Sequence, residues 1–287
     1  MIRKGKDMLN EIELKRLAWE IRKAIIYEIS SKGGGHVGGT LDLAELLAVL
    51  YGAVMNVRPE DPSWPQRDNL VCSKGHSGPA IYAALALKGF FPYEKLKTLN
   101  CANTTLPGHC DRRVPGIDAT TGSLGQGLSI ACGLALGARM SGYDKNVFCI
   151  LGDGELDEGQ NWEAALFAAH HKLDQLTAFL DWNKKQIDGT NDAVMSLGDI
   201  QAKFRSFGWH VQMVGGRDIP GIYHAIEEAR STQGQPSIVI LDTVKGAGIP
   251  CIEQIADNHC IGVPRDLAER AFAELDEEAR MMGGEDR

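Results

Sequence analysis

The spacing of hydrophobic residues changes several times along the chain, and each change predicts a different element. Apolar residues recur every three or four positions across 14–29, with charged residues between them, which predicts an amphipathic helix. The same spacing predicts helices over 41–55, 78–88, 124–140, 161–171, 200–207 and 219–231. Short β-type runs occupy 69–72, 147–151, 176–180, 209–214 and 237–241. This alternation predicts an α/β fold, a doubly wound, mostly parallel sheet with helices on both faces.

Composition narrows the classes of protein that the chain can belong to. The chain has 287 residues, of which 44% are hydrophobic and 24% charged, so disordered and collagen-like proteins are excluded. It carries 30 basic and 38 acidic residues, a net charge of -8, and no run of basic residues, so we expect no nucleic-acid partner. No repeat or low-complexity linker divides the chain. We therefore expect a single domain over 1–287 that begins with a helical segment.

The cysteines and the apolar runs indicate in which cellular compartment we expect the protein. Seven cysteines are scattered without a C-x-x-C pair, a pattern that favours a reducing compartment. The N-terminal segment is charged throughout and lacks the apolar core of a signal peptide. The longest apolar run, 46–55, is far shorter than the roughly 20 residues that span a bilayer. We expect a cytoplasmic protein without a membrane partner.

Polar side chains follow two of the predicted strands that neighbour each other along the chain. The strand 147–151 leads directly into Gly152, Asp153, Gly154 and Glu155, and the next strand is followed by Asn183. Carboxyl ends of parallel strands meet at one edge of a sheet, where ligands bind. A carboxylate and an amide oxygen there, with a backbone carbonyl, water and diphosphate oxygens, would suit Mg²⁺ or Ca²⁺. Taken alone, the Gly-Asp-Gly segment is equally compatible with an acidic surface turn.

The order of the motifs resembles transketolase, a family that uses thiamine diphosphate. The matching segments are GHVGG at 35–39, RDNLVCSKGH at 67–76, LPGH at 106–109, TGSLGQG at 121–127, GDGE at 152–155, Asn183, and IDG at 187–189. The resemblance implies the thiamine-diphosphate-binding fold and a cofactor site with a divalent cation. The loop that opens the predicted helix 124–140 would then direct backbone N–H groups at the cofactor phosphates.

The resemblance also implies a role for individual residues. It implies catalytic roles for His36, His76, His109 and His259. Contacts with the cofactor are implied for His76, Gly122, Ser123, Leu124, Gly152, Asp153, Gly154, Glu155, Asn183, Ile187 and His259. The metal ligands would be Asp153, Asn183 and the backbone carbonyl of Lys185. The implied reaction transfers a two-carbon ketol unit from a ketose phosphate to an aldose phosphate.

The chain departs from the family pattern in length and at three positions. The family's pyrimidine-binding and C-terminal domains have no counterpart in these 287 residues. The resemblance therefore implies a split enzyme, in which a separate C-terminal subunit supplies the glutamate that activates the cofactor and completes the site in an α₂β₂ assembly. Trp182, Val37 and Cys110 stand where the family commonly has other residues, which puts local hydrogen bonding and substrate preference in question.

Other interpretations of the same residues stay open at this stage. A deoxyxylulose-phosphate synthase or the α subunit of a 2-oxoacid dehydrogenase E1 would share the fold, and a non-catalytic binding module would keep only the diphosphate site. A nucleotide-binding loop is disfavoured because the chain has no GxxxxGK[ST]. Cys101 with His109 and Cys110, and Cys251 with His259 and Cys260, repeat one spacing that matches no usual zinc motif.

Some polar residues have two equally plausible roles or only a structural one. Glu158 and Glu163 match family acids near a subunit interface but are equally compatible with solvated acids in the first turn of a helix. His170, His171, His210 and His224 lie away from the motif segments, so we expect no role in the site for them.

Overall fold

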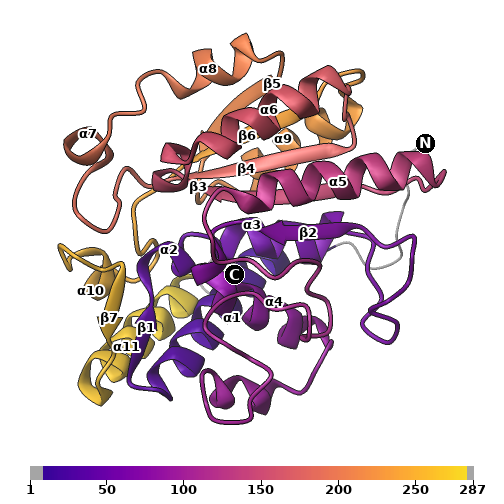
Figure 1. The fold of residues 1–287 in the computed structure, drawn as a ribbon. Coiled ribbons are helices and arrows are strands. Elements are labelled where there is room, and N and C mark those ends of the chain that lie inside the picture. Colours follow the sequence, from indigo (N-terminus) through magenta and orange to yellow (C-terminus); the bar gives the residue numbers. More distant parts are fainter. Residues whose placement is uncertain (1–8, 283–287) are drawn as a thin grey trace.

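A five-stranded sheet forms the centre of the computed structural model, which describes residues 9–282 (Figure 1). Its strands are β2 (Asn69–Cys72), β3 (Val147–Gly152), β4 (Leu176–Trp182), β5 (His210–Gly215) and β6 (Ser237–Asp242). They lie in the order β2-β3-β4-β6-β5, and every neighbouring pair is parallel. The predicted parallel α/β fold is confirmed, and all five predicted strands are found, with bounds that differ by at most two residues.

Alternate residues of the strands face two different hydrophobic cores. In β3, Cys149 and Leu151 belong to one core, whereas Phe148 and Ile150 belong to the other. The first core is completed by α5 (Gln126–Met140), α6 (Gly159–His170) and α8 (Ile200–Ser206). The second is completed by α1 (Glu11–Ser30), α3 (Ala44–Val49), α4 (Gly78–Lys88), α9 (Ile219–Ser231) and α11 (Arg265–Met282). Burial on both faces explains why β3, β4 and β6 read as largely apolar runs, whereas the edge strand β5 is only partly buried.

The helix predicted over 41–55 is instead three short elements. They are α2 (Gly38–Leu41), α3 and a π-helical turn, η1 (Leu50–Val54). The first break lies at residues 42–43, where the N–H of Leu43 bonds to the carbonyl of Thr40, three residues back. Asp42 is held there by backbone N–H groups of a distant loop, from Gly246 and Ala247. A tertiary contact of this kind leaves no trace in hydrophobic spacing.

A two-stranded antiparallel sheet joins segments that are far apart in the sequence. It pairs β1 (Gly34–His36) with β7 (Cys260–Gly262), and in Figure 1 the two strands lie side by side. A Cβ atom on Gly34 would lie 2.5 Å from the carbonyl oxygen of Ile261, so only glycine fits. Strands of three residues have no readable alternation, which is why the sequence pattern does not predict them.

The remaining elements connect these layers. They are η2 (Gly75–Ser77), η3 (Tyr93–Thr98), η4 (Gly154–Asp157), α7 (Asn191–Val194) and α10 (Pro250–Glu253). Neither α10 nor α11 was expected from the sequence. Within residues 9–282, no helix has both the length and the apolar character needed to cross a bilayer.

Candidate functional site

The two polar segments that follow neighbouring strands meet at one edge of the sheet. β3 and β4 pair so that Gly152 lies opposite Asp181, which brings Asp153 close to Asn183. The backbone N–H of Lys184 donates to Asp153 Oδ2 over 2.5 Å. Lys184 has a φ of 67°, a left-handed conformation that is uncommon for a residue with a side chain. The expected meeting of the two strand ends is observed, and a cavity of about 320 Å³ lies beside it.

Four histidines converge on this cavity from four separate segments. The pairing of β1 with β7 places His36 beside His259, while His76 belongs to η2, which follows β2. His109 lies in a loop whose next residue donates its backbone N–H to the carbonyl of Gly75. The ring centre of His36 lies 5.3–5.5 Å from those of the other three, and those of His76 and His259 are 5.0 Å apart. All four side chains line the cavity.

Burial and nearby cations keep three of these imidazoles neutral at neutral pH. Burial lowers the pKa of His259 to about 4, and the ammonium of Lys245 acts in the same direction. Burial holds the pKa of His76 well below its ordinary value, and the ammonium of Lys74 adds a smaller effect in the same direction. The pKa of His36 is also lowered, by burial and then by His109. A neutral imidazole can both donate and accept a hydrogen bond, which suits contacts with sugar hydroxyls.

The glycine-rich loop before α5 forms another wall of the cavity. Gly122 and Leu124 line it, whereas Ser123 is exposed and is not among the lining residues in the described part of the chain. Gly122 has a φ of 156°, and a Cβ atom there would lie 3.3 Å from the ring of His109. Since α5 begins at Gln126, its N-terminus follows this loop directly, as expected.

Glu155 lines the cavity, but its carboxylate is used within the protein. Oε1 accepts hydrogen bonds from the hydroxyl of Ser73 and from the N–H of Gly125, at 2.7 Å for the latter. Oε2 accepts from the N–H of Gly152 over 3.0 Å. The hydroxyl of Ser73 in turn accepts from the N–H of Gly127. Glu155 therefore joins three segments of the cavity wall.

The oxygen atoms at the strand ends fit a hard divalent cation. Both amide hydrogens of Asn183 are directed at carboxylates, so its oxygen is left for other partners and accepts only the N–H of Lys185 within the described residues. Burial raises the pKa of Asp153 to about 6, and Asp181 adds to this effect, so a cation nearby would favour the ionised carboxylate. With the carbonyl of Lys185, these groups form the all-oxygen set that Mg²⁺ and Ca²⁺ prefer.

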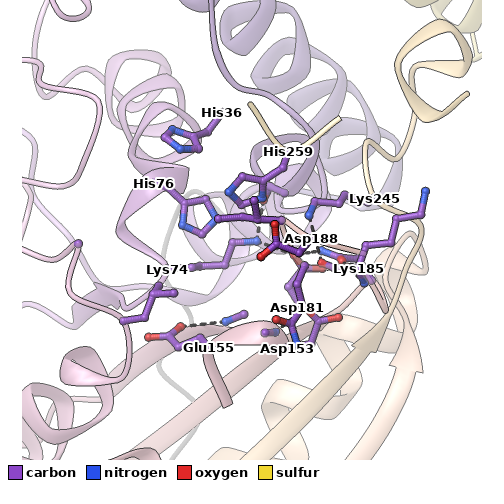
Figure 2. A pocket seen from close by; sticks show the side chains of 18 of the residues that line it. His36, Lys74, His76, Asp153, Glu155, Asp181, Lys185, Asp188, Lys245 and His259 are labelled. Atoms are coloured by element: carbon purple, nitrogen blue, oxygen red, sulfur yellow. Dashed lines mark hydrogen bonds and ion pairs between the residues drawn. The ribbon is translucent and has the colours of Figure 1, made fainter. Parts of the chain in front are cut away.

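Four charged residues of the cavity wall, Lys74, Asp181, Asp188 and Lys245, were not among the site residues expected from the sequence. Lys74 donates to Asp181 and to the carbonyl of Gly39, and Lys245 donates to the carbonyl of Lys185 over 3.1 Å. Figure 2 shows both lysines between the histidines and the carboxylates of Asp153 and Asp181. Lys245 follows β6, so the rule applied to Asp153 and Asn183 could have identified it.

Another charged residue that was not expected at the site, Asp42, lies behind the cavity wall. It contacts Asn183 and the loop that carries Lys245. Burial and then Asp181 raise its pKa well above the ordinary range, and Lys74 and two backbone N–H groups oppose this shift. No feature of the sequence near Asp42 pointed to such a position.

The remaining candidates lie outside the cavity. Glu158 and Glu163 are exposed on and before α6. Of the four histidines without an expected role, His210 pairs with Glu228, and none lines the cavity in the described part of the chain. All seven cysteines are free of disulfides, and across residues 9–282 no group of three or more His, Cys, Asp or Glu side chains is placed to hold a metal ion.

Comparisons with known proteins agree with this geometry. The family model described as transketolase, thiamine diphosphate binding domain, matches residues 14–273. The chain is 49% identical to the 6-deoxy-6-sulfo-D-fructose transketolase subunit SqwG of Clostridium sp. (strain MSTE9), over 93% of this chain and 98% of that one. It is 39% identical to one of the subunits of the apulose-4-phosphate transketolase of Actinobacillus succinogenes, over 93% and 97% of the two chains.

A solved structure extends the likeness to three dimensions. The crystal structure of transketolase from Campylobacter jejuni superposes with a TM-score of 0.88 at 28% identity. The match covers 93% of this chain and 43% of the longer one. The fold, the cavity and the family match lead to one conclusion: the chain belongs to the transketolase family and contains its thiamine-diphosphate-binding domain.

Proposed function

We propose that this chain is the diphosphate-binding subunit of a two-chain transketolase that acts on ketoses with a terminal sulfonate or phosphate. The observation that carries the proposal is the cavity itself, which four histidines line together with Asp153 and Asn183. Relatives that match along nearly their whole length are named as subunits of transketolases for a sulfonated ketose and for a ketose phosphate. We also propose that residues 1–287 form a single domain and that the protein is cytoplasmic, as expected from the sequence.

Some residues of the cavity would bind the cofactor and its cation, and others would bind the sugar. Asp153, Asn183 and the carbonyl of Lys185 would hold Mg²⁺ or Ca²⁺, and the cation and Lys245 would neutralise the diphosphate. Gly122 and Leu124 would contact the cofactor from the loop before α5. When bound, thiamine diphosphate supplies a carbon nucleophile for the ketose carbonyl.

The histidines would act on the sugar. A neutral imidazole can accept a proton from a hydroxyl and return it, and it can fix a hydroxyl position by a hydrogen bond. All four imidazole rings line the cavity in which such a hydroxyl would lie.

An exposed apolar surface at the mouth supports the need for a partner chain. Ile187 lines the cavity yet is 64% exposed, and Val244, next to Lys245, is 58% exposed. Val194 lies near the Cβ position of Gly189, and Met195 beside it is 60% exposed. We call these four side chains (Ile187, Val194, Met195 and Val244) the apolar rim. Exposed apolar groups around a polar site are typical of a surface that another chain covers.

The test is reconstitution from purified chains. This chain is combined with a candidate partner subunit that carries the cofactor-activating glutamate, thiamine diphosphate and Mg²⁺. Donors are a 6-sulfonated ketose, a ketose phosphate and the matching neutral ketose, and the aldose product is measured. We expect transfer only from the mixture and only with the anionic donors. Efficient transfer by this chain alone would show that the split-enzyme proposal is wrong.

The metal site is tested by cofactor binding to the assembled enzyme. Asp153→Ala should remove metal-dependent binding of thiamine diphosphate, because the carboxylate is the charged member of the oxygen set. Calorimetry on the assembled enzyme measures the affinity. An unchanged affinity would show that the cation is held elsewhere.

A further inference from the structure

The amide of Asn183 is oriented by two buried carboxylates. Nδ2 donates to Asp42 Oδ2 over 3.1 Å and to Asp181 Oδ2 over 2.9 Å. All three residues are at least nine-tenths buried. An amide has one acceptor atom and one donor atom at nearly equal positions, so its hydrogen bonds decide which of them faces a ligand. Here both N–H groups are directed at carboxylates, which leaves the amide oxygen for another partner.

The two carboxylates are held from different directions. Asp42 Oδ1 accepts from the N–H groups of Gly246 and Ala247, at 2.7 and 3.1 Å. Asp181 Oδ2 also accepts from the ammonium of Lys74, while Asp181 Oδ1 has no partner within the described residues. Both oxygens of Asp42 thus have a hydrogen-bond partner, whereas Oδ1 of Asp181 has none within the described residues.

We propose that Asp42 and Asp181 are positioning residues that present the oxygen of Asn183, rather than its NH₂ group, to the divalent cation. The inference rests on the proposed metal site. Neither carboxylate is a ligand in this proposal, and both act through Asn183. Groups that orient metal ligands typically contribute about 10- to 100-fold to metal affinity.

Because both oxygens of Asp42 but only one oxygen of Asp181 accept hydrogen bonds, the same substitution at the two positions should have different effects. Asp42→Asn and Asp181→Asn each replace one carboxyl oxygen with an NH₂ group without changing the shape of the side chain. An asparagine at 181 can place its NH₂ at the unused oxygen position and keep both accepted hydrogen bonds. An asparagine at 42 must direct its NH₂ either at Asn183 or at two backbone N–H groups. The first choice sets the NH₂ groups of two asparagines against each other and favours a flipped Asn183 amide.

The experiment titrates Mg²⁺ into the assembled enzyme at saturating thiamine diphosphate and follows binding by calorimetry. We expect Asp42→Asn to raise the apparent Kd for Mg²⁺ by about 10- to 100-fold, and Asp181→Asn to raise it clearly less. Asp199→Asn, at the N-cap of α8, makes the same chemical change far from the cavity and should leave the Kd unchanged, since asparagine caps helices as well as aspartate does.

A second measurement separates orientation from general damage. At saturating Mg²⁺, the affinity of Asp42→Asn for thiamine diphosphate should return to near the wild-type value, whereas a distorted pocket would stay weak. If Asp42→Asn does not fold, Asp42→Ala is measured instead and should also raise the Kd for Mg²⁺. Equal losses in the two asparagine variants, or an unchanged Kd in Asp42→Ala, would overturn the inference. A wild-type enzyme that binds the cofactor without metal would overturn the proposed metal site itself, whereas the proposed two-chain transketolase is tested by reconstitution.

Discussion

His259 is the histidine whose position depends most on tertiary structure, because it reaches His36 only through the pairing of β1 with β7. We predict that His259→Ala lowers ketol transfer by at least about 100-fold, as is common for a group that transfers protons in the transition state. Its thermal midpoint should change little, because the ring is only partly buried. His224→Ala, an exposed change on α9, is the control. Normal turnover by folded His259→Ala would show that the imidazole is structural.

Glu28 is a buried carboxyl that the site does not use. It is fully buried in α1, and neither of its oxygens has a hydrogen-bond partner within the described residues. Burial raises its pKa well above the ordinary value. A carboxyl whose pKa is higher in the folded state contributes stability at pH values below the unfolded pKa, near 4.5, and this contribution is lost as the pH rises through the folded pKa.

Glu28→Met should therefore stabilise the protein at pH 8, because at that pH the wild-type carboxyl ionises readily in the unfolded chain but not in its buried position. The gain in thermal midpoint should be roughly 2–4 °C for each kcal/mol gained, and it should shrink as the pH approaches 5. Calorimetric melting at several pH values measures it. A gain that is the same at pH 5 and pH 8 would mean that packing, not ionisation, is responsible.

At the scale of elements, Glu155 joins the ends of β2 and β3 to the loop before α5. Both of its oxygens accept hydrogen bonds, so a glutamine must direct its NH₂ at a backbone N–H group of either Gly125 or Gly152. Leaving one such group without an acceptor costs about 1–3 kcal/mol. We predict that Glu155→Gln binds thiamine diphosphate at least about tenfold more weakly.

Fluorescence titration of the assembled enzyme with thiamine diphosphate checks this prediction. Glu227→Gln is the matched control, because it makes the same change in α9, where Glu227 pairs with Arg230. A wild-type affinity in Glu155→Gln would show that the three segments hold their positions without this carboxylate.

At the scale of the whole molecule, the apolar rim is the surface through which we expect the partner to complete the site. Met195→Glu should weaken the association of the two chains by about tenfold or more, since a buried interface disfavours an unpaired charge. The thermal midpoint of the chain alone should not change, because Met195 is 60% exposed. Met281→Glu in α11, 66% exposed, is the control. Analytical ultracentrifugation of the mixed chains measures association, and identical behaviour of the two variants would place the interface elsewhere.

The sequence alone determined the parallel sheet, its strands and the positions of the site segments. Continuous apolar runs of about four to seven residues identify strands buried on both faces, and strand ends in a parallel sheet meet at one edge. That is why the meeting of Asp153 with Asn183 could be predicted from the chain itself. The order of the motifs added the histidines and the cofactor loop.

Only the tertiary structure decided which groups support those residues. Lys74, Asp42 and Asp181 act through hydrogen bonds that join segments far apart in the sequence, such as that between Asp42 and Asn183. Glu155 was expected to contact the cofactor, but its carboxylate is engaged by backbone N–H groups and by Ser73. Hydrophobic spacing records which face of an element is buried. It does not indicate which distant group donates a hydrogen bond to a buried oxygen, because the two groups meet only when the chain has folded.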